Sequence, residues 1–278
     1  MLKSEAFDKN KFNVLISAPK GGRVYMSIDA ALRLNPKIKK VALVFFMGIG
    51  DYFLSTNFLQ FLKQRYFHLS FQAFVSKNFD SNNSPLVGKV LEKNPHFDAV
   101  SYYDGHKNTE YWKNYDYGDC LSKVDDETLL LPMIYEFHPW ICSRTEALCE
   151  TFCLPKPNIV APPIVYVNYE PSDKVREIFD KITQKMATGK YKGVLFMQLT
   201  SRSSSYTYPY IDELISQFIK EGYCILCVEK SSVVSDGCIS IDTEIFDINE
   251  SIKLVSMLKK YNLAFVTITS CFGRFRLG

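Results

Sequence analysis

The chain has 278 residues, of which 47% are hydrophobic and 23% charged, and its formal net charge is +3. This is the composition of an ordinary globular protein with a sizeable core, and the charge is too small to indicate nucleic acid by itself. No apolar run approaches the ~20 residues that span a bilayer, and the polar start shows no signal-peptide pattern. We therefore expect a cytoplasmic protein with at most weak contact with an anionic membrane surface.

The first half of the chain alternates between predicted strands and predicted helices, which is typical of a doubly wound α/β domain. One helix is expected to bury an apolar face made of Phe53, Leu54, Phe58, Phe61 and Leu62. The helix over 143–153 begins with a capping box, Ser143 with Glu146. The predicted strands are 13–19, 39–47, 69–76, 97–105 and 127–137, and the predicted helices are 26–35, 52–66, 84–95 and 143–153.

A proline-rich stretch divides this half from the next one. Residues 154–173 hold five of the 12 prolines, and because proline blocks helices and removes backbone donors, we expect a stiff linker. The alternation then restarts. The predicted helices are 174–186, 210–222 and 249–262, and the predicted strands are 193–199, 223–230, 238–244 and 263–270.

A carboxylate stands where the buried strand 39–47 turns into a helix. Gly48 and Gly50 allow a tight turn and a close approach of a ligand, and Asp51 follows at or just before the helix start. Asp51 is either a helix N-cap or a general base in a cleft, and the local pattern favours neither. The position of a third fingerprint glycine is taken by Phe53, which argues against a dinucleotide site.

Two further loops follow predicted strand ends, where ligands bind in open parallel sheets. The loop after 193–199 is rich in hydroxyl groups and holds Arg202, so it is either a phosphate-binding loop or a solvated serine-rich loop. The loop after 263–270 is a second candidate anion site or an irregular chain end. Cys224 and Cys227 form C-x-x-C within a predicted strand, where they point to opposite faces, so we expect no metal site there.

The order of these segments resembles the bacterial heptosyltransferase family, glycosyltransferase family 9. The opening motif of that family, an apolar strand, a Gly-Asp pair and a helix with a basic end, is matched by Gly50-Asp51 and the residues up to Tyr66. Its N-P-x-I-D-x-V segment is similar to residues 94–100, and its strand, S-R-x-x-K-x-W-P loop and helix are similar to residues 194–230. The resemblance runs from about Ile38 to Ser270 in the right order.

The resemblance implies a GT-B type α/β fold, with two Rossmann-like domains facing a cleft. It implies an N-terminal acceptor-side domain over 1–153, with 1–37 as an added element, the linker over 154–173, and a partial C-terminal nucleotide-sugar-binding domain over 174–278. The reaction it implies is inverting, metal-independent transfer of a heptose or related sugar from a nucleotide sugar, ADP-heptose above all, to a hydroxyl of a saccharide or protein acceptor. The expected partners are this donor and a saccharide or lipopolysaccharide-core acceptor, with no nucleic acid and no cofactor.

Residue by residue, the resemblance implies that Asp51 is the catalytic base and that Gly48, Gly50 and Ser55 form the acceptor-side loop. A second set of residues binds the donor. This set is Thr200, Ser201, Arg202, Tyr206, Thr269 and Ser270.

The chain departs from the family in its donor half. Ser205 or Tyr206 stands where the family has a lysine against the diphosphate, and Tyr208 replaces a tryptophan. In the last motif Thr269 replaces an aspartate, and no histidine follows. An inactive, truncated sugar- or nucleotide-binding module is therefore the alternative to an active transferase. A methyltransferase using S-adenosylmethionine is a weaker alternative, because no acid ends the strand 69–76.

Overall fold

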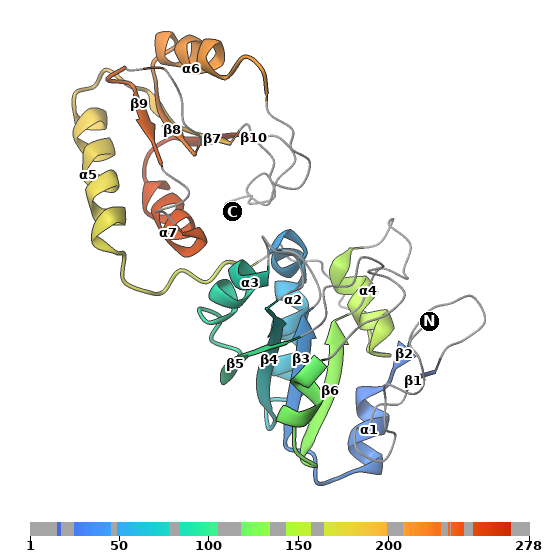
Figure 1. Ribbon diagram of the computed structural model, residues 1–278. Helices are drawn as coiled ribbons and strands as arrows, with labels where there is room; N and C mark the ends of the chain where they lie inside the picture. Colours follow the sequence, from blue (N-terminus) through green and yellow to red (C-terminus); the bar gives the residue numbers. More distant parts are fainter. Residues whose placement is uncertain are drawn as a thin grey trace. The chain divides into compact units, whose positions relative to one another are not determined.

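The chain forms two compact units in a computed structural model, unit 1 over Met1–Tyr166 and unit 2 over Val167–Gly278 (Figure 1). The boundary between the units falls inside the expected linker. The structure describes residues 16–17, 25–45, 49–77, 84–104, 118–133, 143–156, 164–198, 208–228, 233, 235–241 and 247–267.

Unit 1 is built on a four-stranded parallel sheet in the order β5-β4-β3-β6. Its central strand β3 is almost completely buried, as its unbroken apolar run predicts. Pro132 lies in β6, at the edge of the described sheet, where a residue without an N–H is tolerated. The strands are β3 (Lys40–Phe45), β4 (Ser70–Ser76), β5 (Ala99–Tyr103) and β6 (Thr128–Met133), and the helices are α2 (Ile49–Arg65), α3 (Ser84–Leu91), the 3-10 helix η2 (Gly118–Lys123) and α4 (Arg144–Thr151).

An N-terminal extension precedes this sheet and comprises the strands β1 (Ile16–Ser17) and β2 (Tyr25–Met26) and the helix α1 (Ile28–Leu34). Asp29 fastens α1 to the end of α2, because its carboxylate accepts hydrogen bonds from Arg65 at 2.8 Å and from the Tyr66 hydroxyl at 2.7 Å. Burial alone raises the pKa of Asp29, but these two hydrogen bonds and the charge of Arg65 outweigh it, so the pKa lies below its usual value.

Helix α2 is buried on more sides than a single apolar stripe predicts. Phe53, Phe58 and Leu62 are buried as expected, whereas Leu54 and Phe61 are only half-buried. Because α2 packs against both α3 and α4, further side chains are enclosed. These additional buried residues are Tyr52, Ser55, Thr56, Leu59 and, just past the helix end, Tyr66.

The predicted capping box of α4 is confirmed. The Ser143 hydroxyl accepts a hydrogen bond from the Glu146 amide at 3.1 Å, and the Glu146 carboxylate accepts one from the Ser143 amide at 2.9 Å. Two amides at the helix start thereby gain partners, and this fixes the helix that packs against α2.

The variant Ser143→Ala should lower the free energy of unfolding of unit 1 by about 1 kcal/mol, because it removes the cap acceptor. Both tryptophans, Trp112 and Trp140, belong to unit 1, so tryptophan fluorescence in a urea titration reports this unit. Ser143→Asp keeps an acceptor and is the control. An equal loss in both variants would contradict the capping role.

Unit 2 repeats the architecture of unit 1 with a four-stranded parallel sheet in the order β9-β8-β7-β10. In chain order this is third, second, first, fourth, the same order as in unit 1. That order is shared by the first four strands of a doubly wound nucleotide-binding sheet. The strands are β7 (Gly193–Gln198), β8 (Tyr223–Cys227), β9 (Cys238–Ser240) and β10 (Leu263–Thr267), and the helices are α5 (Asp173–Ala187), α6 (Ile211–Lys220) and α7 (Ile248–Leu258).

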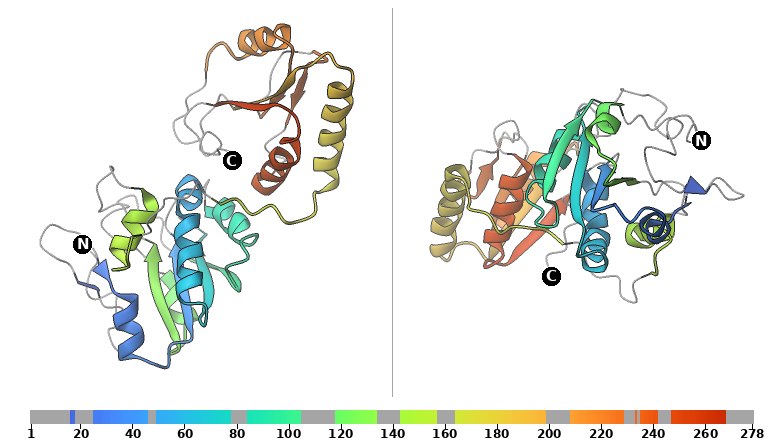
Figure 2. Two further views of the ribbon diagram at one scale, coloured as in Figure 1. Left: turned by 180° about the vertical axis from the view of Figure 1, so that it is seen from behind. Right: turned by 90° about the horizontal axis from the view of Figure 1, so that it is seen from below.

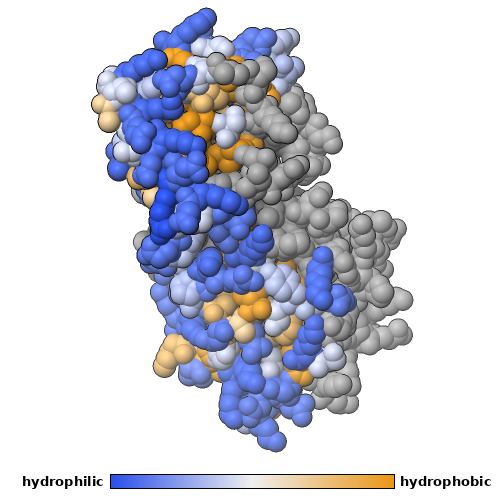
Figure 3. Space-filling view, turned by 60° about the vertical axis from the view of Figure 1, so that its left-hand side comes forward, coloured by the Kyte–Doolittle hydropathy of each residue, from blue (hydrophilic) through white to orange (hydrophobic). Residues whose placement is uncertain are grey.

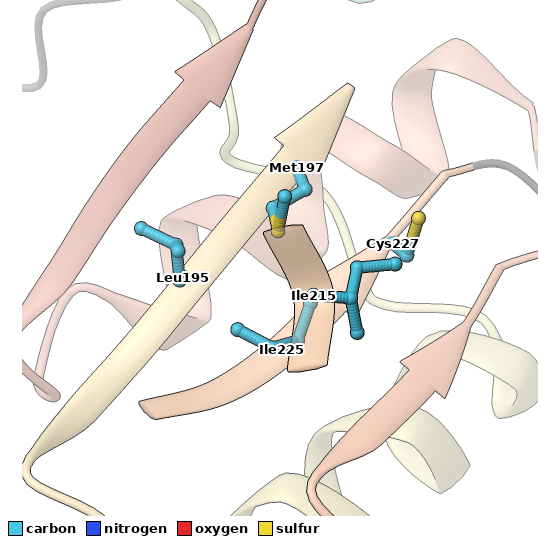
Figure 4. Close-up of a cluster of buried hydrophobic side chains, with 5 residues drawn as sticks. All are labelled: Leu195, Met197, Ile215, Ile225 and Cys227. Carbon is cyan, nitrogen blue, oxygen red and sulfur yellow. The ribbon is translucent and has the colours of Figure 1, made fainter. Parts of the chain in front are cut away.

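The sheet of unit 2 has helices on both faces, α6 on one and α5 and α7 on the other (Figures 1 and 2). Alternate residues of β7 and β8 turn to α6 and surround Ile215, as period-two strands require (Figure 4). This cluster is Leu195, Met197, Ile215, Ile225 and Cys227. Gly222 follows the end of α6 with φ +87°, the left-handed conformation that glycine adopts freely.

Hydrophilic side chains dominate the face drawn in Figure 3, with smaller hydrophobic areas among them. The large exposed hydrophobic side chains of the described residues are Leu34, Phe67 and Tyr210. Single exposed side chains of this kind are common on soluble surfaces and do not define a site.

Candidate functional site

The order of the strands gives each unit one topological switch point, where the first strand lies beside the fourth. These are β3 with β6 in unit 1 and β7 with β10 in unit 2. In open parallel sheets, ligands bind outside the carboxyl ends of the strands at this place. We therefore expect the residues of the site to lie near these two positions.

Asp51 follows the carboxyl end of β3, the first strand at the switch point of unit 1. It is the third residue of α2, so the N-cap interpretation is wrong: the helix begins at Ile49, before Asp51. The side chain of Asp51 and the whole of Gly48 lie outside the described residues.

Gly50 and Ser55 lie within α2 and not in a loop, which corrects their assignment to an acceptor-side loop. Ser55 is completely buried, and its hydroxyl donates to the Tyr52 carbonyl oxygen at 2.7 Å. The helix starts earlier than the predicted Tyr52 because a single glycine, Gly50, does not prevent a helix whose following residues are buried on several sides. A fully buried hydroxyl is not available to a saccharide.

Tyr52 fixes the first turn of α2 from inside the unit. Its ring packs edge-on against Phe45 at the end of β3, with 6.2 Å between centroids. Its hydroxyl oxygen accepts a hydrogen bond from the side-chain amide of Asn94 at 3.1 Å. Burial raises the pKa of Tyr52 well above its ordinary value, so the phenol stays neutral. The residue next to Asp51 is thus a rigid anchor.

The segment similar to the family's N-P-x-I-D-x-V pattern supports the fold. Asn94 is buried and bonded to Tyr52, and the Asp98 carboxylate accepts hydrogen bonds from the Phe71 amide at 2.7 Å and the Ser70 hydroxyl at 2.9 Å. Burial alone raises the pKa of Asp98, but these hydrogen bonds outweigh it and the pKa is lowered. Asp98 therefore secures the start of β4.

The predicted donor-binding residues follow the two strands at the switch point of unit 2. Thr267 at the end of β10 is in register with Gln198 at the end of β7, so the segments after both strands start at the same edge of the sheet. The predicted residues themselves lie outside the described residues. They are Thr200, Ser201, Arg202, Tyr206, Thr269 and Ser270.

Helix α6, which follows the serine-rich segment, does not offer a simple anion site at its start. Its cap residue Tyr210 makes no side-chain capping bond, and its first turn contains Asp212 and Glu213. These two carboxylates oppose an anion near the helix start, although the helix dipole favours one. Tyr208, at the position of the family's tryptophan, packs against the core of unit 2.

Cys224 and Cys227 lie in β8 as predicted, and both thiols are buried. Burial raises the pKa of Cys224 to about 11. Within the part of the chain that the structure describes, no three His, Cys, Asp or Glu side chains are grouped closely enough to hold a metal ion. The helices of that part include none that is both long and apolar enough to cross a membrane.

Comparisons with known proteins identify the fold. A glycosyl transferase of family 9 from Veillonella parvula aligns with 85% of this chain and 76% of its own, at 12% identity and a TM-score of 0.53. The chain has the fold of a family 9 glycosyltransferase. The ADP-heptose lipopolysaccharide heptosyltransferase II of E. coli aligns with 84% of this chain and 80% of its own, at 12% identity and a TM-score of 0.50.

The heptosyltransferase WaaC of E. coli, solved with ADP, gives the same identity and TM-score over 84% of this chain and 82% of its own. No protein-family model and no curated protein sequence matches the chain. The predicted GT-B type α/β fold with Rossmann-like units is confirmed, and at 12% identity the likeness to family 9 glycosyltransferases concerns the fold.

Tyr52 and Thr56 are buried in the first part of α2, but they were not predicted from the sequence as residues of the site. The spacing of these two residues in the sequence could have indicated that they are buried. Tyr52, Thr56 and Leu59 recur at i, i+4 and i+7, which is a helical face, but two of the three are polar or amphipathic.

Proposed function

We propose that this protein is a glycosyltransferase that moves a sugar from a nucleotide sugar to a hydroxyl group of an acceptor. The observation that carries the proposal is the likeness to family 9 transferases over 84–85% of the chain. It is supported by the position of Asp51, in the first turn of the helix that follows the first strand at the switch point of unit 1.

In the proposed reaction Asp51 accepts the proton of the acceptor hydroxyl while that oxygen attacks the anomeric carbon of the donor. The new glycosidic bond forms as the bond between the anomeric carbon and the diphosphate oxygen breaks, and the nucleoside diphosphate leaves with the electron pair. A single displacement inverts the anomeric centre. Arg202 and the hydroxyl groups of the serine-rich segment meet the diphosphate charge without a metal.

ADP-heptose is the first donor to test, because two of the structures with this fold are named as heptosyltransferases and one of these was solved with ADP. A saccharide of the lipopolysaccharide core is the matching acceptor. A cytoplasmic protein with peripheral contact with the inner membrane would meet both.

A nucleotide- or sugar-binding module without activity is the second candidate. It is favoured by Ser205 and Tyr206 where the family has a lysine, and by the two carboxylates in the first turn of α6. In such a module the donor binds, but the diphosphate charge that develops on bond breaking is not compensated.

Thermal shift and release of nucleoside diphosphate separate these candidates in one panel of nucleotide sugars. For a transferase, ADP-heptose should raise the melting temperature and release ADP faster when lipopolysaccharide-core acceptor is added. A thermal shift without release would support the binding module. If no nucleotide sugar gives either signal, both proposals are wrong.

Arg202→Ala should weaken nucleotide binding by roughly tenfold, because a charge-assisted hydrogen bond to phosphate contributes on the order of 1.5 kcal/mol or more. Isothermal titration with ADP measures this. Arg176→Ala is the matched control, because Arg176 is an exposed arginine of the same unit that pairs with Asp173 at 2.9 Å. Unaltered affinity in Arg202→Ala would remove Arg202 from the site.

A further inference from the structure

The linker is attached to the helix that carries Asp51 through one buried hydroxyl group. Thr56 is completely buried in α2, and its hydroxyl oxygen accepts a hydrogen bond from the Ile164 amide at 2.8 Å, across 108 residues of sequence. The same hydroxyl donates to the Phe53 carbonyl oxygen at 2.8 Å. One side chain thus joins the linker to the first part of α2.

Ile164 is the first residue after Pro162 and Pro163 that has a backbone N–H. Prolines have no N–H to donate, so Ile164 is the first amide after this pair with which the chain can attach itself to unit 1. Thr56 supplies the acceptor. A valine of nearly the same shape would leave this amide without the bond.

The attachment lies next to the point where unit 2 begins. The Val167 carbonyl oxygen accepts a hydrogen bond from Lys253 at 2.8 Å, and the Tyr169 hydroxyl donates to the Asn249 carbonyl oxygen at 2.8 Å, so this part of the linker is held by α7 of unit 2. The linker is therefore hydrogen-bonded to α2 of unit 1 at Ile164 and to α7 of unit 2 at Val167.

The first part of α2 contains a second hydrogen bond from a buried hydroxyl group to a carbonyl oxygen of the preceding turn. Ser55 donates to the Tyr52 carbonyl oxygen, and Tyr52 is held by Asn94. Hydroxyl groups that bond to carbonyls of the preceding turn adjust the local course of a helix. Asp51 directly precedes these tied residues, so its backbone position depends on them.

We infer that Thr56 is a positioning residue of the transferase. Its hydrogen bond with the Ile164 amide lets the linker fix the first part of α2, and this fixes the backbone position of Asp51. The inference rests on the proposed function for its catalytic part. Its structural part is that the hydrogen bond from the Ile164 amide to Thr56 stabilises the first part of α2. This part can be tested without any enzymatic activity.

Amide hydrogen exchange tests the structural part in the full chain. In Thr56→Val, exchange of the Ile164 amide should become at least roughly tenfold faster, and so should exchange of the amides of residues 56 and 57, whose helical acceptors are the Tyr52 and Phe53 carbonyls. Thr56→Ser keeps the hydroxyl and should restore the slow rates.

Thr151→Val is the matched control. Thr151 is buried in α4, and its hydroxyl donates to the Ala147 carbonyl oxygen at 2.9 Å, so the same substitution removes a buried hydroxyl group from another helix of unit 1. Exchange at Ile164 and in α2 should stay unchanged in this variant. Equal acceleration in Thr56→Val and Thr151→Val would overturn the inference, because the effect would then be general loosening.

Kinetics test the catalytic part. Thr56→Val should lower kcat roughly tenfold with the KM of donor and acceptor changed less than twofold, because small misplacement of a catalytic group slows the chemical step. Ile164→Pro removes the donor of the same bond without altering α2, and should lower kcat similarly. If Thr56→Val does not fold, Ile164→Pro alone decides.

The double variant Thr56→Val with Ile164→Pro should be no slower than either single variant, because both remove one bond. Additive losses, or an unchanged kcat in Ile164→Pro, would overturn the inference. A wild-type protein without activity toward any nucleotide sugar would refute the proposed function and, with it, the catalytic part. The exchange rates would still decide the structural part.

Discussion

Asp51→Asn should lower kcat for sugar transfer by roughly a hundredfold or more, the usual contribution of a general base, and should leave the fold intact. Asparagine has nearly the same size as aspartate but does not accept a proton. Because Asp51 is the third residue of α2, its replacement by asparagine leaves the N-cap residue of the helix unchanged. Release of nucleoside diphosphate in the presence of acceptor measures kcat, and circular dichroism checks the fold.

Asp173→Asn is the control for Asp51→Asn. Asp173 is also an aspartate in the first turn of a helix, α5 of unit 2, and its exposed carboxylate pairs with Arg176. Its replacement should leave kcat within about twofold, since exposed ion pairs contribute little to stability. If Asp51→Asn retained full specific activity, the general-base assignment would be wrong.

Phe58→Ala should lower the free energy of unfolding of unit 1 by about 3–5 kcal/mol, the usual loss for a buried phenylalanine replaced by alanine. The ring of Phe58 in α2 stacks on Phe152 at the end of α4, with 5.4 Å between centroids, and both side chains are completely buried. At an m-value of about 2 kcal/mol per molar urea, the fluorescence midpoint should fall by about 2 M.

Phe67→Ala is the matched control, because Phe67 lies just beyond the same helix with 78% of its surface exposed. This variant should change the free energy of unfolding by less than about 0.5 kcal/mol. A similar loss in both variants would mean that the stacked pair does not hold α2 against α4. The comparison isolates burial, since the two variants remove the same side chain.

The alternation of elements in both units could be predicted from the sequence, because each element has a strong local signal. The run of apolar residues over 41–47 predicts a buried parallel strand, and β3 occupies Lys40–Phe45. Ser143 and Glu146 predict a capping box, and Gly222 predicts a helix end with positive φ. These signals are determined by neighbouring residues and do not depend on distant contacts.

The start of α2 could not be placed in the same way. Helix propensity disfavours Gly50, and the sequence therefore predicted a helix that begins only at Tyr52. Packing against α3 and α4 encloses the helix on several sides, so that burial outweighs propensity.

Local sequence signals were sufficient to predict the alternation of strands and helices, the division by prolines and the order in which the candidate residues follow the strands. The strand order, which is the same in both sheets, came from the tertiary structure alone: α2 with Asp51 follows the first strand at one switch point, and the serine-rich segment follows, in the chain, the first strand at the other. The tertiary structure also decided that Thr56 meets Ile164, 108 residues away, and that Asn94 meets Tyr52. Hydrogen bonds between distant residues leave no periodic pattern in the chain, because they depend on how the elements pack and not on the residues beside them.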